Sequence, residues 1–489
     1  MKLIDVLKGV ENYKAKGDLE VEINNIDNNS KNIKEGDVFI AIKGFDFDGH
    51  DFVSDAVKQG AIAVVLDMSA DLKKIKISKN TTVILVENTR KCLAKMASNF
   101  FGNPAKKLRL VGVTGTKGKT TTTFMIKSIL EKAGKKVGLI GTVANYIGDK
   151  CLGESSRTTP DSLELQRIFA QMVKEKVDIV VMEVSSQSLK LDRVAFCEFE
   201  YGVFTNFYKD HISPKEHPDL EDYFNSKSKL FTMCKQGFIN ADDFKGTKIQ
   251  ALNSSCEFKT YGIDNFADML AKDITITNKS VDYKLKIQDR NERIKVNIPG
   301  RFSVYNSLAA ISVALKYGAT VDNIKDALLE ITVPGRSEMV ANDKELAIMI
   351  DYAHTAESLQ SILQAVKSYT KGNVICVFGC GGDRDSSKRP LMGEAVGKIA
   401  DLAIITTDNP RTENPMDIIN EIEKGIKKTK GKYKVIEDRK EAIKEAIKVA
   451  SKRDIIVLAG KGHEPYQEIN GTKYPFDERI IVKEIMEGK

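Results

Sequence analysis

A glycine-rich loop between a predicted strand and a predicted helix constrains this chain more than any other feature. The segment GTKGKTT, residues 115–121, follows an apolar run over residues 108–113 and precedes a helical pattern over residues 119–133. Small residues let backbone amides approach phosphate oxygens, and the helix N-terminus adds partial positive charge. Lys119 is then expected to reach the β- and γ-phosphates of a nucleotide, and the Thr120 hydroxyl to bind Mg²⁺. The alternative is a structural turn with an incidental lysine, since the strict Walker pattern has one further glycine where this chain has valine.

Strands alternate with helical patterns through most of the chain. Buried strands are predicted at residues 137–140, 178–184, 346–350, 373–378, 402–406 and 454–458. Such alternation indicates parallel, doubly wound α/β sheets. Residues 274–298 instead alternate polar and apolar side chains, as antiparallel strands do, and a helix is predicted over residues 304–316.

The chain of 489 residues is too long for a single core. A helix over residues 90–100 ends at Gly102-Asn103-Pro104, and a third block of the sequence begins near Pro334-Gly335-Arg336. These breaks predict three domains, residues 1–105, 106–333 and 334–489.

Composition favours a cytoplasmic protein without a nucleic-acid partner. The net charge is +7, but the lysines alternate with acidic residues and form no basic stripe, so a small polyanionic substrate explains the excess as well. The seven cysteines are scattered, odd in number and expected to be reduced. The sequence has no apolar run of about 18 residues and no signal-like start, so neither membrane insertion nor secretion is expected.

Several polar residues follow predicted strands, where open α/β sheets bind ligands. Glu183 ends one strand beside the phosphate loop and is suited to a hard cation. His211, His354 and His463 each follow a further strand. A single histidine is more often structural, and His50 and His217 are interpreted so.

Many motifs, in one order along the whole chain, resemble those of the Mur ligases. They are Ser30-Lys31 with Gly36-Asp37, GTKGKTTT from Gly115, TTP from Thr158, MEVSS from Met182, TNFYKDHISPKEHP from Thr205, VPGRSEMV from Val333, DYAHT from Asp351, GCGGDRDSSKRP from Gly379, DNPRTENP from Asp408 and AGKGHEPYQ from Ala459. The resemblance implies an N-terminal UDP-binding domain, a central P-loop ATPase domain and a C-terminal Rossmann-like ligase domain.

The implied reaction is the addition of meso-diaminopimelate to UDP-N-acetylmuramoyl-L-alanyl-D-glutamate (UDP-MurNAc-L-Ala-D-Glu), a step of cytoplasmic peptidoglycan precursor synthesis. ATP with Mg²⁺ would activate the D-glutamate side chain as an acyl phosphate, which the amine then attacks, so that catalysis is mainly positioning and charge neutralisation. L-Lysine or another diamino acid is the nearest alternative. A folylpolyglutamate synthase-like ligase and a non-enzymatic nucleotide switch are remoter ones, and a monomer is expected.

The resemblance also implies the site residues. Catalytic roles fall to Lys119, Glu183, His211 and Lys227, and the metal ligands are Thr120, Glu183, His211 and Lys227 as a carbamate. ATP would be bound by Gly115, Thr116, Lys117, Gly118, Lys119, Thr120, Thr121, Asn306, Arg336, Asp351 and His354. The UDP-linked dipeptide would contact Ser30, Thr158, Thr159, Ser185 and Arg193, and the diamino acid Arg384, Asp408, Asn409, Arg411, Gly460 and Glu464.

Four positions depart from the family pattern. Leu191 stands where many relatives have a polar substrate-contacting residue, Arg157 stands where some have Asn, and Ser303 and Ala356 replace a common Asn and Pro. An Arg such as Arg411 suits the distal carboxylate of meso-diaminopimelate, and Glu464 its ammonium.

Overall fold

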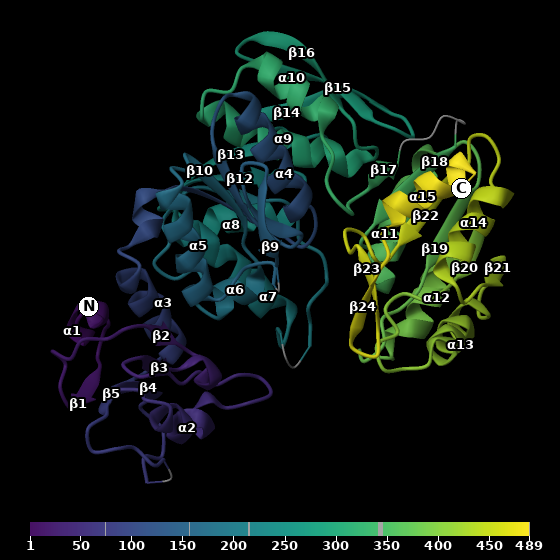
Figure 1. Cartoon of the computed structure of the whole chain (residues 1–489). Helices are drawn as coiled ribbons and strands as arrows, with labels where there is room; N and C mark the ends of the chain where they lie inside the picture. Colours follow the sequence, from purple (N-terminus) through teal and green to yellow (C-terminus); the bar gives the residue numbers. More distant parts are fainter. Residues whose placement is uncertain (74, 156, 214–215, 341–345, 489) are drawn as a thin grey trace. The chain divides into compact units, whose positions relative to one another are not determined.

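The structure, a computed structural model, describes residues 1–73, 75–155, 157–213, 216–340 and 346–488 (Figure 1). Residues 214 and 215, within the motif that begins at Thr205, therefore lie outside the described residues. The chain forms two compact units, a first of Met1–Asp268 with Ser312–Gly318 and a second of Met269–Ile311 with Ala319–Lys489. The three predicted domain boundaries stay predictions. Within the described ranges, no helix is long and apolar enough to cross a membrane, and all seven cysteines are free thiols.

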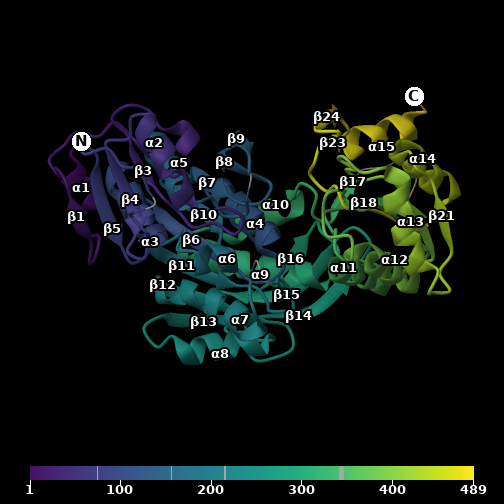
Figure 2. The ribbon, with the colours of Figure 1, turned by 90° about the horizontal axis from the view of Figure 1, so that it is seen from below.

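The N-terminal part of the first unit is a five-stranded sheet with helices on both faces (Figure 2). Its strands, in pairing order, are β1 (Lys14–Lys16), β5 (Thr82–Val86), β4 (Ala63–Asp67), β3 (Val38–Ile40) and β2 (Ile26–Asp27). Helices α1 (Leu3–Leu7) and α3 (Thr89–Phe100) pack on one face and α2 (Val53–Lys58) on the other. The alternation within β4 explains this, since Ala63 and Val65 point to α3 while Val64 and Leu66 point to α2.

The central sheet of the first unit carries the phosphate loop. In pairing order its strands are β13 (Glu257–Gly262), β12 (Cys234–Asn240), β11 (Phe199–Phe204), β6 (Arg109–Thr114), β10 (Ile179–Glu183), β7 (Val137–Ile140), β8 (Ala144–Ile147) and β9 (Lys150–Glu154). Strands β13 to β7 are parallel, and β8 and β9 pair antiparallel. The helices of this part are α4 (Lys119–Lys132), α5 (Ser162–Lys174), α6 (Ser186–Lys190), α7 (Leu220–Ser228) and α8 (Phe244–Leu252).

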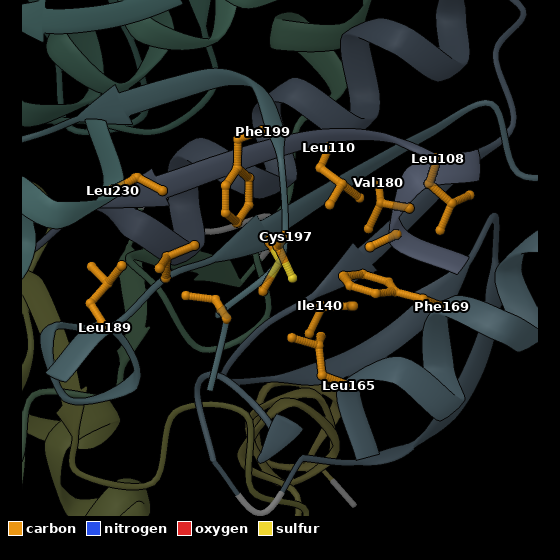
Figure 3. Packing of buried hydrophobic residues seen from close by; sticks show 14 of the residues in the cluster. Leu108, Leu110, Ile140, Leu165, Phe169, Val180, Leu189, Cys197, Phe199 and Leu230 are labelled. Atoms are coloured by element: carbon orange, nitrogen blue, oxygen red, sulfur yellow. The ribbon is translucent and has the colours of Figure 1, made fainter. Parts of the chain in front are cut away.

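Apolar spacing fixes α5 against this sheet. Leu165, Ile168, Phe169 and Met172 follow helical spacing and are buried in one cluster with sheet residues such as Val180. Figure 3 shows Leu165 and Phe169 beside Ile140 and Val180. Truncating a buried aromatic side chain such as Phe169 typically costs about 3–5 kcal/mol.

The second unit begins with three antiparallel strands, as predicted. They are β14 (Met269–Ile276), β15 (Val281–Ile287) and β16 (Arg290–Val296), and the helices α9 (Arg301–Lys316) and α10 (Val321–Glu330) follow. The end of α9, from Ser312 on, belongs to the first unit. Strand β14 starts five residues before the predicted segment. A register shift between Lys272 and Thr275, with Asp273 at a φ of 49°, interrupts the alternation that the prediction used.

The C-terminal sheet of the second unit is parallel except at one edge. Its strands, in pairing order, are β17 (Glu338–Val340), β18 (Ala347–Asp351), β22 (Ile455–Ala459), β19 (Val374–Phe378), β20 (Leu402–Ile405) and β21 (Tyr433–Val435), with β17 antiparallel. Helices α11 (Ala356–Tyr369), α12 (Lys388–Ile399) and α13 (Pro415–Ile426) cover one face, and α14 (Arg439–Val449) and α15 (Glu478–Glu487) the other. A hairpin of β23 (Tyr466–Ile469) and β24 (Thr472–Pro475), which was not predicted, forms a separate two-stranded sheet.

Candidate functional site

The predicted phosphate loop joins β6 to α4 and is held from outside by the segment after β11. The backbone N–H of Thr116 donates to the Asn206 carbonyl at 2.9 Å, and that of Lys117 to Asn206 Oδ1 at 2.9 Å. The Thr205 hydroxyl donates to the Lys117 carbonyl at 2.6 Å. Gly115, with a φ of 144°, has no room for a side chain, since a Cβ would lie 1.9 Å from Thr205 Oγ1. Neighbouring strands therefore fix the loop in its curved form.

Two lysines, the half-buried Lys119 and the buried Lys227, converge on one carbonyl of this loop. Lys119 Nζ donates to the carbonyls of Gly115 at 2.9 Å and Thr116 at 3.1 Å. Lys227, on α7 and 1% exposed, donates to the same Gly115 carbonyl at 2.8 Å and lies over the Tyr223 ring. Burial, and after it the charge of Lys119, lowers the pKa of Lys227 well below its usual range.

A cavity of about 270 Å³ adjoins the two lysines. Its lining includes six predicted site residues, namely Lys119, Thr158, Ser185, Arg193, His211 and Lys227, together with Arg157, Ser186, Gln187, Glu216 and His217. His211 has a φ of 58° and hydrogen-bonds Glu216 at 3.1 Å. The cavity thus brings together Lys119 of the phosphate loop, three of the five residues predicted for the dipeptide and two of the four predicted metal ligands.

Glu183 and Thr159 connect the cavity wall to the strands beneath it. Glu183 is 1% exposed, and its two carboxylate oxygens accept from the Thr142 N–H at 2.9 Å and the Thr142 hydroxyl at 3.1 Å. The Thr142 hydroxyl also meets that of Thr158 at 3.1 Å. The Thr159 hydroxyl donates to the Glu183 carbonyl at 2.9 Å, and its own carbonyl accepts from Arg193 at 3.2 Å.

The residues beside the first cavity fit a Mg²⁺ ion whose remaining ligands are phosphate oxygens and waters. Among the described residues no three His, Cys, Asp or Glu side chains cluster to hold a metal by themselves. Mg²⁺ generally takes one or two protein carboxylates and completes its shell with phosphate oxygens and waters. The buried Thr120 hydroxyl and the Glu183 carboxylate are hard oxygen donors of that kind.

A second cavity of the first unit, about 310 Å³, has three arginines in its lining, Arg90, Arg157 and Arg193. Arg157 and Arg193 also line the first cavity. Asp161 pairs with Arg193 at 2.9 Å and Arg157 at 3.5 Å, and Asp46 also belongs to the lining, so two carboxylates offset part of the charge. Leu191 and the exposed Phe45 and Phe47 belong to the same lining, whereas the half-buried Ser30 does not.

In the second unit, the residues predicted for the diamino acid gather at the carboxyl ends of β20 and β22. Asn409 contacts two charged side chains of this group, since its Nδ2 donates to Glu464 at 2.8 Å and its Oδ1 accepts from Lys461 Nζ at 3.0 Å. A Cβ on Gly460 would lie 2.5 Å from Asp408 Oδ2, so this glycine lets the two loops approach. Burial, followed by the charge of Asp408, raises the pKa of Glu464.

Both predicted arginines of this group lie in the loops beside it. Arg411 donates through Nη1 to the Gly382 carbonyl at 2.7 Å and through Nε to Glu468 at 3.1 Å. Arg384 is exposed, one residue after Asp383, whose carboxylate accepts from the Thr412 hydroxyl at 2.7 Å.

Three of the residues predicted for adenosine surround Tyr352 or the strand before it. The Arg336 guanidinium lies 4.9 Å from the centre of the Tyr352 ring, and the His354 ring 4.7 Å. Asp351 accepts from the Ser337 N–H at 2.8 Å, and burial raises its pKa. Asn306 is buried on α9 and belongs to the same unit.

Three residues without a predicted role organise these groups. Asn206 hydrogen-bonds the phosphate loop, and Lys461 is fully buried beside Asn409. The Tyr352 ring contacts two predicted side chains, those of Arg336 and His354. Each lies inside a segment singled out from the sequence, but only the fold shows what it contacts. His217, interpreted as structural, bonds Asp222 at 2.6 Å and Ser186 at 2.9 Å and also lines the first cavity.

Comparisons with known proteins agree along the full length of the chain. Three family models match, described as "Mur ligase family, catalytic domain" over residues 22–101, "Mur ligase middle domain" over 113–314 and "Mur ligase, glutamate ligase domain" over 335–462. The UDP-N-acetylmuramoyl-L-alanyl-D-glutamate–2,6-diaminopimelate ligase of Caldanaerobacter subterraneus subsp. tengcongensis is 50% identical over 487 residues, 99% of each chain. The ligase 1 of the same description from Clostridium acetobutylicum is 46% identical over 489 residues, again 99% of each chain. A solved structure described as such a ligase superposes with a TM-score of 0.70 at 29% identity, covering 100% of this chain and 99% of that one.

Proposed function

Because the chain belongs to the Mur ligase family, we propose that it joins meso-diaminopimelate to UDP-MurNAc-L-Ala-D-Glu at the expense of ATP. Full-length relatives at 45–50% identity that bear this description support the choice of substrates. The observation that carries the proposal is the phosphate loop held by its neighbours, with Lys119 and Lys227 on one carbonyl, beside a cavity whose lining includes three of the predicted dipeptide residues.

In the proposed reaction the loop amides and Lys119 bind the β- and γ-phosphates of ATP. The D-glutamate side-chain carboxylate attacks the γ-phosphorus, and ADP leaves as an acyl phosphate forms. The amine of the diamino acid then attacks the acyl carbon, loses its proton and displaces inorganic phosphate. The chain needs no covalent nucleophile for this, because its residues bind, orient and neutralise charge.

Mg²⁺ would be held by Thr120, Glu183 and His211, and it would neutralise the negative charge of the phosphates. Lys227 would join them as a carbamate. Its burial and lowered pKa support this assignment, since a neutral amine is the form that reacts with carbon dioxide. The carbamate would place an anion beside the Lys119 ammonium, with which it would pair.

The UDP-linked dipeptide would extend across the two cavities of the first unit. Arg193 and Arg157 line both, and with Arg90 they outnumber the two carboxylates of the second cavity, Asp46 and Asp161, which favours a diphosphate. Thr158, Thr159 and Ser185 would contact the peptide, and Ser30 would act from outside the cavity lining on the uridine side.

In the second unit, adenosine would be bound by Asn306, Arg336, Asp351 and His354. The diamino acid would be bound by Arg384, Asp408, Asn409, Arg411, Gly460 and Glu464. The clustering of five of these six around β20 and β22 supports a common ligand. The enzyme is further proposed to act as a monomer in the cytoplasm, where ATP is available.

Phosphate release from ATP tests the whole proposal. Purified protein with UDP-MurNAc-L-Ala-D-Glu and Mg²⁺-ATP should release phosphate rapidly only when meso-diaminopimelate is added. A panel with L-lysine and other diamino acids identifies the amino acid that the enzyme uses. If phosphate is released faster with L-lysine, then L-lysine and not meso-diaminopimelate is the substrate. Release that needs no amino acid would contradict a ligase altogether.

A further inference from the structure

The turn between β7 and β8 lies against the carboxylate of Glu183. Strand β7 pairs parallel with β10 so that Ile140 lies beside Met182, and the next residues of the two segments, Gly141 and Glu183, come together. A Cβ on Gly141 would lie 2.4 Å from Glu183 Oε1, so a side chain there would displace the carboxylate. Thr142 donates its backbone N–H to Glu183 Oε1 at 2.9 Å and its hydroxyl to Glu183 Oε2 at 3.1 Å. One residue therefore holds both carboxylate oxygens.

The same hydroxyl contacts Thr158, which lines the first cavity. The hydroxyl oxygens of Thr142 and Thr158 lie 3.1 Å apart. Thr158 is fixed through its neighbour Thr159, whose hydroxyl donates to the Glu183 carbonyl at 2.9 Å and accepts from the Ser185 N–H at 3.1 Å. Thr158 belongs to the cavity lining, whereas Thr142 lies behind it. Thr142 can therefore affect a ligand of this cavity through Thr158 and Glu183.

The direction of these hydrogen bonds follows from the carboxylate. An ionised carboxylate only accepts, and a hydroxyl has one proton and two acceptor lone pairs. Because the hydroxyl proton of Thr142 goes to Glu183, the proton shared by the two threonines comes from Thr158. The Thr142 hydroxyl thus donates and accepts at the same time. A valine of the same shape can do neither, and its methyl group would face a carboxylate that has lost a donor.

We propose that Thr142 is a positioning residue that fixes Glu183 for the metal and Thr158 for the dipeptide. This inference rests on the proposed function and extends it to a residue that touches neither ligand. With a single hydroxyl between them, the carboxylate and the Thr158 side chain are held in one arrangement before any ligand binds. Removing that hydroxyl frees both side chains, so that each ligand must order its own residue on binding.

Binding measurements on Thr142→Val and Thr142→Ser test the proposal without turnover. Isothermal titration calorimetry with UDP-MurNAc-L-Ala-D-Glu, in the absence of metal and nucleotide, reports on Thr158. Electron paramagnetic resonance of Mn²⁺ in the presence of ADP reports on Glu183. Thr142→Val should weaken each affinity by about fivefold or more, the usual effect of an unsatisfied buried group. Thr142→Ser, which keeps the hydroxyl, should bind both probes within about twofold of the unsubstituted protein.

Two further variants and one further ligand complete the experiment. Thr142→Ala lacks the hydroxyl without placing a methyl group beside the carboxylate, and it takes the place of Thr142→Val if that protein does not fold. Thr247→Val is the matched control, because this exposed threonine on α8 donates to the Phe244 carbonyl of its own helix at 2.8 Å. It should leave both affinities unchanged. Binding of ADP without metal, which depends on the phosphate loop, should be normal in every variant.

Three results would overturn the inference. The first is normal binding of either probe by the variant without the hydroxyl. The second is an equal loss in Thr142→Ser, because the effect would then not belong to the hydroxyl. The third is a matching loss of metal-free ADP binding, which would indicate general damage to the site. Failure of the unsubstituted protein to bind UDP-MurNAc-L-Ala-D-Glu would instead contradict the proposed function.

Discussion

Replacing Glu478 by glutamine should destabilise the C-terminal sheet and loosen the diamino-acid site above it. Glu478, on α15, and Arg439, on α14, form an ion pair at 2.8 Å with side chains 1% and 0% exposed. Arg439 also donates to the Ala459 carbonyl at 2.8 Å and the Thr407 carbonyl at 3.5 Å. Those carbonyls directly precede Gly460 and Asp408, so the pair supports both loops of the site.

The size of the effect follows from burial. Removing one partner of a buried pair typically costs about 3–5 kcal/mol, since the other charge stays in a low-dielectric interior. Glutamine still offers an oxygen to Arg439 Nε, so we expect the lower end, about 3 kcal/mol. For a domain of this size each kcal/mol shifts the unfolding temperature by about 2–4 °C, which gives a decrease of about 6–12 °C.

Thermal unfolding by circular dichroism measures the shift, and hydrogen exchange over β20 and β22 locates it. Glu484→Gln is the control, because its ion pair with Lys440 joins the same two helices at 2.9 Å but is exposed, and it should leave the unfolding temperature within about 2 °C. The reasoning fails if Glu478→Gln unfolds within about 2 °C of the unsubstituted protein. It fails equally if Glu484→Gln is as unstable as Glu478→Gln.

Three substitutions test the proposed chemistry. Lys119→Ala should abolish phosphate release while leaving the unfolding temperature nearly unchanged, and a normal rate would contradict its contact with the β- and γ-phosphates. Lys227→Ala should be almost inactive and partly recover with added short carboxylic acids, which a merely structural lysine would not explain. Arg411→Ala should reduce kcat/KM for meso-diaminopimelate by at least about tenfold, since loss of a charged partner costs about 2–5 kcal/mol. The value of kcat/KM for L-lysine should fall far less. Equal losses with the two substrates would show that Arg411 does not determine specificity.

Local patterns predicted the strand–loop–helix unit of the phosphate site closely. The helix predicted over residues 119–133 is α4, Lys119–Lys132, and the strand predicted over 137–140 is β7. Glycines lie beside these elements, Gly118 before α4, Gly134 after it and Gly141 after β7, so their limits are set by neighbouring residues. The antiparallel edge strand β17 and the hairpin β23–β24 were not predicted, because their burial is partial and their pairing depends on distant residues.

Contacts between loops could not be predicted from spacing. The sequence indicated that Arg411 lies near a strand end, and β20 does end shortly before it. Its ion pair with Glu468 depends on a hairpin that returns more than fifty residues later in the chain. Likewise, no periodicity marks Lys461 as buried, since lysine is rarely buried without a partner. Only the packed loops supply that partner, Asn409.

Asparagine has the same physical role in both units. Asn206 accepts from the Lys117 N–H and donates to the Lys117 carbonyl, and Asn409 accepts from Lys461 while it donates to Glu464. Both follow parallel strands, β11 and β20, at the carboxyl ends where loops converge. A carboxylate in either place would accept but not donate, and would leave a carbonyl or a second carboxylate facing a negative charge. The amide is therefore the side chain that can join two loops without adding charge to the site.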